Sequence, residues 1–307
     1  MLKLELLNQI AAMSFTKSLY FFFCFSLVLA ISSCKPSEQK NNDSDEFQEA
    51  GESLKSTIEE VVYGIPSPTE IPYLIQQTGA EYNEKLLNPR TKTDQYANRT
   101  EKAALNLGVY TADIGYLASY DKTQEAIEYL NSCKILADNL GVIGSFDIDL
   151  LRRFEANIGN KDSLSILLDN TTKETEKFLK DDSRNRVAAL VVTGSFVEGL
   201  FISTGLVNSY PKDILPANVR DNILTPVIQV ILNQEKSVSD LLKMLTAVEQ
   251  TDPISTLVRD LQELEKAYAA LNIEEQMQNN RGDLVMSDRN LIQITEIVSS
   301  MRKSITD

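Results

Sequence analysis

Histidine and tryptophan are absent from this chain of 307 residues, and cysteine occurs only three times. The lack of histidine removes the commonest general base and the commonest metal ligand, and we expect neither a cofactor nor a metal. Basic residues are also scarce, because 30 Lys and Arg oppose 44 Asp and Glu and the net charge is −14. That balance argues against a nucleic-acid partner, which needs clustered cations to displace counterions.

What is present begins with the pattern of a secretion signal over residues 1–33. Lys17 precedes an apolar run of 13 residues from Leu19 to Ile31. A secretion signal has a positive flank and an apolar core of about 7–15 residues, whereas a membrane-spanning helix needs about 20. Met13 is an alternative start, because residues 1–12 add an uncharacteristic prefix with an acidic Glu5.

The end of the apolar run predicts where the mature protein resides. Ile31-Ser32-Ser33-Cys34 resembles the bacterial lipobox, in which a branched apolar residue and two small residues precede a cysteine. The resemblance implies that the sulfur of Cys34 takes a diacylglycerol and that its freed amine takes a third acyl chain. The alternative is an ordinary signal peptide with a chance cysteine. Lys35 replaces the aspartate that retains lipoproteins at the inner membrane, which favours the outer membrane and a periplasmic or cell-surface location.

Residues 34–46 are expected to form a lipidated, flexible tether. After Cys34 this stretch contains no apolar side chain except the ring of Pro36, so it cannot bury surface. Cys24 leaves with the signal and Cys34 carries lipid. Cys133 then has no partner for an intramolecular disulfide in the mature chain.

Beyond residue 46 the apolar residues recur at helical spacing, and no segment alternates as a strand would. The pattern predicts a single all-α domain over 47–307, a compact bundle of about eight to ten helices. A central helix at 188–207 is expected to be apolar on all sides and buried. The expected helices cover 47–61, a short stretch ending near 77, and then 97–120, 121–140, 147–157, 163–180, 184–208, 216–250, 253–271 and 287–306.

Some positions predict how these helices pack and end. In 97–120, five small side chains share one face, which permits close approach of a neighbouring backbone: Ala104, Gly108, Thr111, Gly115 and Ser119. Asp121 is expected to cap the next helix, with Gln124 at its third position. Pro226 is expected to kink or break 216–250. Asp252 and Pro253 have the pattern of a cap followed by the first helical residue.

Four segments together resemble an uncharacterised family of all-helical lipoproteins from Bacteroidota-type bacteria. These segments are Tyr63–Pro68, Gly79–Asn83, Lys102–Asp113 and Ala137–Gly141. The resemblance implies a helical fold and an envelope location, but no activity and no functional residues. Residues 107–141 also read as one tetratricopeptide-style helix hairpin, without a second copy about 34 residues away.

Asp113 and Glu198 are the candidate chemical residues, because each is an acid on an otherwise apolar or small face. Two converging carboxylates could perform acid–base catalysis or hold a cation. The structural interpretation, which we favour, makes Asp113 a solvent-edge acid and Glu198 a core acid paired with Lys or Arg or hydrogen-bonded to a helix end. Tyr110 or Tyr116 could line a pocket around Glu198.

Other motifs carry less weight. Gly194, Ser195 and Gly199 resemble a hydrolase elbow, but the context is mid-helix and no histidine exists, so we reject it. Asp43-Ser44-Asp45 starts like a calcium loop but lacks the later ligands. Cys133 lies on an apolar face and is predicted to be a buried small hydrophobe.

Two surface motifs also have simpler structural interpretations. Arg281-Gly282-Asp283 is the adhesion tripeptide, but Gly282 is better explained as a turn between helices. Asp162-Ser163-Leu164 fits a short glycosylation pattern, and equally a helix cap, which we favour.

We therefore expect a lipid-anchored, non-enzymatic helical envelope protein that binds a protein or another envelope component. An alternative is a ligand-binding lipoprotein associated with a nutrient transporter. Similar helical glycan-binding lipoproteins use exposed Trp and Tyr, and this chain has 11 Tyr but no Trp. An enzyme that works with carboxylates alone is a third alternative.

Overall fold

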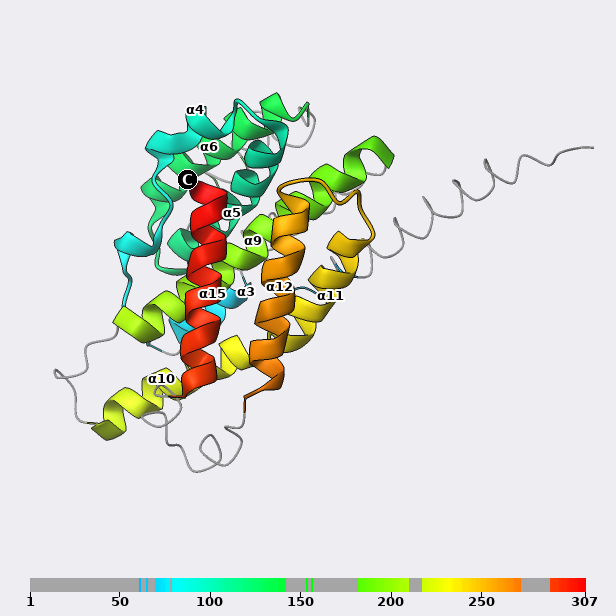
Figure 1. Ribbon diagram of the computed structural model, residues 1–307. Coiled ribbons are helices and arrows are strands. Elements are labelled where there is room, and N and C mark those ends of the chain that lie inside the picture. The colour runs from blue at the N-terminus through cyan, green and yellow to red at the C-terminus, as the bar shows by residue number, and fades with distance from the viewer. Residues whose placement is uncertain are drawn as a thin grey trace, which may run out of the picture. The chain divides into compact units, whose positions relative to one another are not determined.

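Helices are the only regular elements in the described part of the chain, which confirms the all-α prediction there (Figure 1). The computed structural model describes residues 70–141 except 78, then 182–209, 217–271 and 288–307, with single positions at 61, 65, 153 and 156. All of these belong to one compact unit, Ala50–Asp307. Several predictions concern residues outside the described ones: the signal at 1–33, Cys34 and the tether, most of 47–61, the helices at 147–157 and 163–180, and the motifs at 43–45, 162–164 and 281–283.

The described ranges contain eight α-helices of eight residues or more. In chain order they are α3 Glu70–Gln77, α5 Thr100–Ser119, α6 Thr123–Asn139, α9 Asp182–Ser209, α10 Ala217–Leu232, α11 Glu235–Thr246, α12 Ile254–Ala269 and α15 Arg289–Thr306. A short segment between α3 and α5 contains the 3-10 turns η1 Glu84–Leu86 and η2 Arg90–Lys92 and the single-turn helix α4 Thr93–Tyr96. Gly79 and Gly141 have positive φ angles of 82° and 71° after α3 and α6, where the sequence places helix ends.

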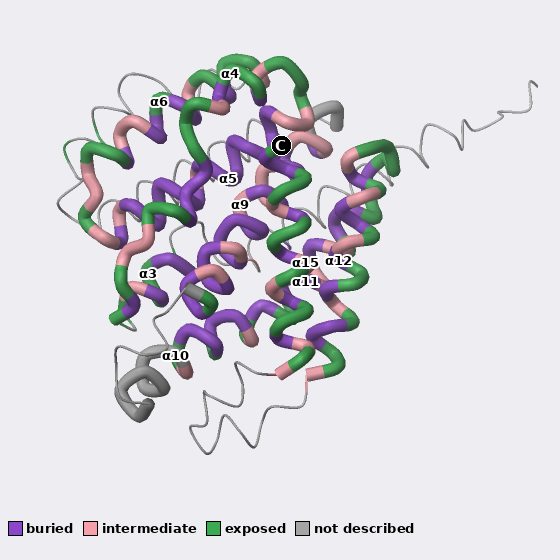
Figure 2. Tube along the Cα trace, turned by 60° about the vertical axis from the view of Figure 1, so that its left-hand side comes forward, coloured by how far each residue is buried: buried purple, intermediate pink, exposed green. Residues whose placement is uncertain are grey.

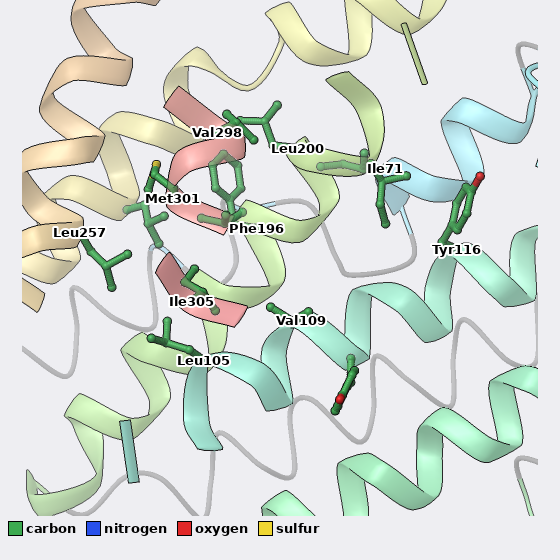
Figure 3. Close-up of a cluster of buried hydrophobic side chains, with 14 of the residues drawn as sticks. Ile71, Leu105, Val109, Tyr116, Phe196, Leu200, Leu257, Val298, Met301 and Ile305 are labelled. Carbon is green, nitrogen blue, oxygen red and sulfur yellow. The ribbon is translucent and has the colours of Figure 1, made fainter. Parts of the chain in front are cut away.

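Helix α9 is the central helix, as predicted. Residues Asn185–Asn208 are long and apolar enough to cross a membrane by length and composition, but 72% of the most apolar window is buried inside the protein. Helices α3, α5, α10, α11 and α15 all contact α9. Figure 2 shows α5 and α9 buried along most of their length, whereas α11, α12 and α15 keep an exposed face. In Figure 3, Phe196 and Leu200 of α9 lie with Val298 and Met301 of α15 in the core.

Helices α5 and α9 cross with their backbones in contact. A Cβ atom on Gly108 would lie 2.0 Å from the carbonyl oxygen of Val191, and one on Gly194 would lie 2.0 Å from the carbonyl oxygen of Leu105. No side chain fits at either position, so the crossing requires glycine on both helices. The small-residue face predicted for 97–120 therefore has the packing role expected of it.

Asp121 corrects one prediction, because it ends α5 instead of capping α6. The residue has a φ angle of 59°, in the left-handed region. Its N–H donates to the Ala118 carbonyl at 3.2 Å, and the N–H of Lys122 donates to the Leu117 carbonyl at 2.9 Å. This pair of bonds is the Schellman arrangement that closes a helix C-terminus, and aspartate tolerates the required conformation. Lys122 occupies the N-cap position of α6 and makes no side-chain capping bond.

Pro226 was expected to kink or break the segment 216–250, and the break is contradicted because α10 continues through this residue. Pro226 lies inside α10 with an exposed side chain, and the buried side chains of Val227, Ile228 and Ile231 hold the helix against the core. The break comes at Asn233–Gln234. There the Gln234 side chain donates from Nε2 to the Val230 carbonyl at 3.0 Å and so satisfies the end of α10.

The start of α12 differs from the prediction by one residue. Pro253 occupies the N-cap position, so Asp252 lies one residue earlier than expected. The Asp252 carboxylate accepts hydrogen bonds from the hydroxyls of Ser255 at 2.8 Å and Thr256 at 3.1 Å. These bonds hold the first turn of α12 through side chains, which is a different use of the same acid.

Candidate functional site

Asp113 and Glu198 meet in the interior, where α5, α9 and α15 come together. Both side chains have an exposed fraction of 0%. The prediction that Asp113 lies at the solvent edge is therefore wrong. The physical reason is that Glu198 of α9 and the backbone at Asn88 cover this side chain, on a helix of which 15 of 20 residues are buried between α9 and other elements.

Arg302 of α15 is the partner of Glu198. Its Nε donates to Glu198 Oε2 at 3.1 Å and its Nη2 donates to Oε1 at 3.2 Å. The guanidinium also lies 4.6 Å from the centre of the Phe201 ring. A two-bond pair of this kind satisfies both carboxylate oxygens and fixes their orientation. The prediction that Glu198 is a core acid paired with Lys or Arg is confirmed.

Asp113 approaches the same carboxylate from α5. Its Oδ2 accepts the backbone N–H of Asn88 at 3.2 Å, and its carboxyl group lies beside that of Glu198. Among the described residues, no donor group gives a hydrogen bond to Oδ1 of Asp113. Burial, followed by the neighbouring charge of Glu198, raises the pKa of Asp113 well above its ordinary value.

The other two members of this cluster respond to the same environment. Burial raises the pKa of Glu198, whereas Arg302 and the hydrogen bond to Asp113 act to lower it. Burial acts to lower the pKa of Arg302, but Glu198 and Asp113 outweigh it and raise that pKa. Glu198 is therefore the better stabilised carboxylate of the two acids.

Asn88 organises a polar layer beside the acids and is fully buried. Its Nδ2 donates to Asn106 Oδ1 at 3.3 Å, and its backbone carbonyl accepts from the Tyr129 hydroxyl at 2.9 Å. The Tyr96 hydroxyl lies 3.2 Å from Asn88 Oδ1 and 2.9 Å from the Thr306 carbonyl, so its single proton serves one of these acceptors at a time. Burial raises the pKa of Tyr96 to about 12, which keeps this hydroxyl protonated.

The last turn of α15 is held by side chains from other elements. Asn106 of α5 donates to the Ile305 carbonyl at 3.0 Å. Lys92 donates to the Thr306 carbonyl at 2.9 Å and to Asp307 Oδ1 at 3.1 Å. Carbonyls at a helix C-terminus have no partner within their own helix, so these donors dock α15 on the segment before α5 and on α5 itself.

Tyr110 and Tyr116, which the sequence suggested as pocket residues around Glu198, are hydrogen-bonded to backbone groups. Tyr110 is buried and donates to the Pro89 carbonyl at 3.1 Å, and Tyr116 is buried and accepts the N–H of Asn83 at 2.9 Å. Tyr96, Asn88 and Arg302 were not predicted. In a single sequence, a charged residue beside an amphipathic stripe or an asparagine in a turn cannot be distinguished from an ordinary surface residue.

The remaining motifs have structural roles in the described residues. Gly194, Ser195 and Gly199 lie within α9 and not at a strand-to-helix turn. Cys133 is fully buried, and burial raises the pKa of its thiol, as expected of a small hydrophobe. Within the described ranges, no three acidic or cysteine side chains are placed to hold a metal ion.

The arrangement therefore pairs its charges inside the protein. Neither acid reaches solvent, so neither can contact a dissolved substrate in this conformation. Comparisons with protein families, curated proteins and solved structures return no match. The resemblance to helical lipoproteins of Bacteroidota-type bacteria stays a prediction.

Proposed function

We propose that this chain is a lipid-anchored protein of the bacterial envelope, most consistent with the outer membrane, that acts by binding a protein or another envelope component. The observation that carries the proposal is the sequence Ile31–Cys34 at the end of the apolar run Leu19–Ile31. A lipobox-like ending at the correct side of a signal core supports cleavage before Cys34 and lipidation of Cys34.

The buried acids support binding over catalysis. Asp113 and Glu198 were the carboxylates best suited to acid–base chemistry, and they contact each other, Arg302 and the Asn88 amide. A catalytic acid has to reach a reacting atom, directly or through one water. In this fold the pair joins three helices instead, which is a structural use of charge.

Metabolic labelling with an acyl analogue tests the lipid anchor. The wild-type chain is expected to take the label, and Cys34→Ser is expected to lose it completely. Cys133→Ala is the matched control, because it removes a buried cysteine of the helical unit and leaves the lipobox intact. Persistent labelling of Cys34→Ser, or loss of label in Cys133→Ala alone, would contradict the proposed lipid anchor at Cys34.

Recovery of partners tests the binding activity. The chain would be crosslinked in intact cells and purified from detergent-solubilised envelope, beside a Cys34→Ser chain that lacks the anchor. We expect a defined envelope component that depends on the anchor. Recovery of the same material with both chains would point to adventitious association.

A further inference from the structure

The acid cluster contains more negative groups than its cation can balance. Asp113 and Glu198 are both fully buried and their carboxyl groups are neighbours. Two neighbouring carboxyl groups can share a hydrogen bond only if one of them carries a proton. Arg302 already places one N–H on each oxygen of Glu198. Asp113 Oδ1 has no donor among the described residues, so a proton on this acid lets the oxygen itself donate a hydrogen bond.

We propose that Asp113 is a proton-binding site, which holds a proton at neutral pH and donates it to Glu198. The cluster is then neutral overall, with one neutral acid, one carboxylate and one guanidinium. The hydrogen bond from Asp113 completes a link from α5 through Glu198 of α9 to Arg302 of α15. This proposal does not depend on lipidation or on the proposed function.

Among the described residues, Arg302 is the one cation that acts on the pair formed by Asp113 and Glu198. Helix α9 contributes Glu198 and α15 contributes Arg302. The buried residues of α3 are Ile71, Pro72 and Ile75, which do not titrate. The other ionisable groups near the pair all stay neutral at physiological pH, because burial raises their pKa values: Tyr82 before η1, Tyr96 of α4, Tyr110 of α5, and Tyr129 and Cys133 of α6.

The proton on Asp113 makes the stability of the fold depend on pH, and the direction of that dependence follows from the raised pKa. In the unfolded chain Asp113 has the ordinary value of 3.8, whereas the pKa in the folded protein is raised. Between these two values the folded protein binds more protons than the unfolded chain. The stabilisation from this site is fully present below 3.8 and is lost as the pH rises through the folded value. Without its proton, Asp113 competes with Glu198 for Arg302, and we expect the loss to loosen α15 first.

Infrared spectroscopy tests where the proton lies. The full chain in a non-ionic detergent is expected to show the carbonyl band of a neutral carboxylic acid at neutral pH, where exposed acids are ionised. Carbon-13 in the aspartate carboxyl groups should move this band, and Asp113→Asn should remove it. Asp94→Asn, an exposed aspartate of α4, is the matched control and should keep it. Absence of the band from the wild type, or a band unmoved by labelled aspartate, overturns the proposal.

Hydrogen exchange tests the consequence for α15. Protection of α15 amides is expressed relative to α11, so that the intrinsic pH dependence of exchange cancels. Between about pH 5 and 9 we expect the wild type to lose relative protection in α15 as pH rises. Asp113→Asn is expected to show no such change, because its amide can donate to Glu198 and cannot ionise. An equal pH dependence in both proteins, or none in the wild type, overturns the proposed link.

Discussion

At the scale of single residues, the Glu198–Arg302 pair is the most consequential contact in the described structure. Burying two charges costs several kcal/mol per ion, which the pair recovers only with good geometry. Two parallel hydrogen bonds and the Phe201 ring supply that geometry. Ion pairs on the surface, such as Lys236 with Asp240, are screened by water and contribute at most about 1 kcal/mol.

Glu198→Gln is predicted to be strongly destabilising. The substitution keeps the size of the side chain but removes the charge opposite Arg302, whose side chain is only 16% exposed, and only ionisation of the buried Asp113 could replace that charge. We expect the free energy of unfolding to fall by about 3–5 kcal/mol, measured by urea denaturation followed by circular dichroism.

Glu263→Gln is the control for that change, because Glu263 is an exposed residue of α12. Its effect should stay within about 0.5 kcal/mol. If Glu198→Gln is equally mild, then the pair is not buried as described, and the acid would be free for another role.

The sequence predicted that Glu198 is paired in the core, but it predicted neither the identity of its partner nor the burial of Asp113. Glu198 interrupts a long apolar segment, and a charge in such a position needs a buried partner, so its pairing followed from the pattern. Arg302 lies 104 residues away and next to Met301 on the edge of an apolar stripe, where a sequence assigns it to solvent. The burial of Asp113 could not be predicted for a related reason: it depends on Glu198 of α9 and the backbone at Asn88, and a helix pattern does not tell which neighbours a helix has.

At the scale of elements, contacts between backbone atoms set how closely α5 and α9 approach each other. Gly108 and Gly194 each face a carbonyl of the other helix, whereas Gly199 of α9 faces a side chain, with Ile71 Cδ1 at 3.5 Å from an added Cβ. The first two positions have no room for a methyl group. The third has ordinary van der Waals space.

Gly108→Ala is therefore predicted to be destabilising by about 3 kcal/mol or more, because the clash is with backbone and can be relieved only by separating the helices. Gly199→Ala is the matched control. It should be neutral or stabilising by up to about 1 kcal/mol, since alanine favours a helix over glycine. Thermal or urea unfolding of both variants gives the comparison, and similar effects for both would mean that the crossing is looser than described.

Local signals of helix ends were less reliable than the helices themselves. Asp121 followed by Gln124 has the residues of an N-terminal cap, but the same acid tolerates a left-handed backbone and ends α5. Pro226 removes one hydrogen bond of α10, yet the apolar side chains after it hold the helix in place. At Asp121 a second local preference of the same residue prevails, whereas at Pro226 tertiary packing outweighs the local preference.

At the scale of the whole molecule, the fold class followed from periodicity. Apolar residues at helical spacing over most of the chain predicted an all-α protein, and every regular element in the described ranges is helical. The central position of 188–207 followed from its apolar character on all sides. Its neighbours could not be predicted, because the partners of a helix that is apolar all round are not encoded in its own pattern.

The chain from residue 46 onwards, produced without lipid, is predicted to remain in solution without detergent and to give a strongly helical far-ultraviolet circular dichroism spectrum. The physical reason is that α9, although apolar enough to cross a membrane, is covered by other helices. A requirement for detergent, or a substantial β-sheet signal, would contradict both the packing of α9 and the fold class.

The glycine crossing also limits how this sequence can change over evolutionary time. Asp113 has a short side chain and lies five residues after Gly108, and Glu198 lies four residues after Gly194. The close contact of the helix backbones at the glycines brings the two acids together across the same interface. We therefore expect a descendant that retains the acid pair to retain both glycines, since a wider crossing would move Asp113 away from its partner. Four positions on two helices are therefore expected to be inherited together or lost together.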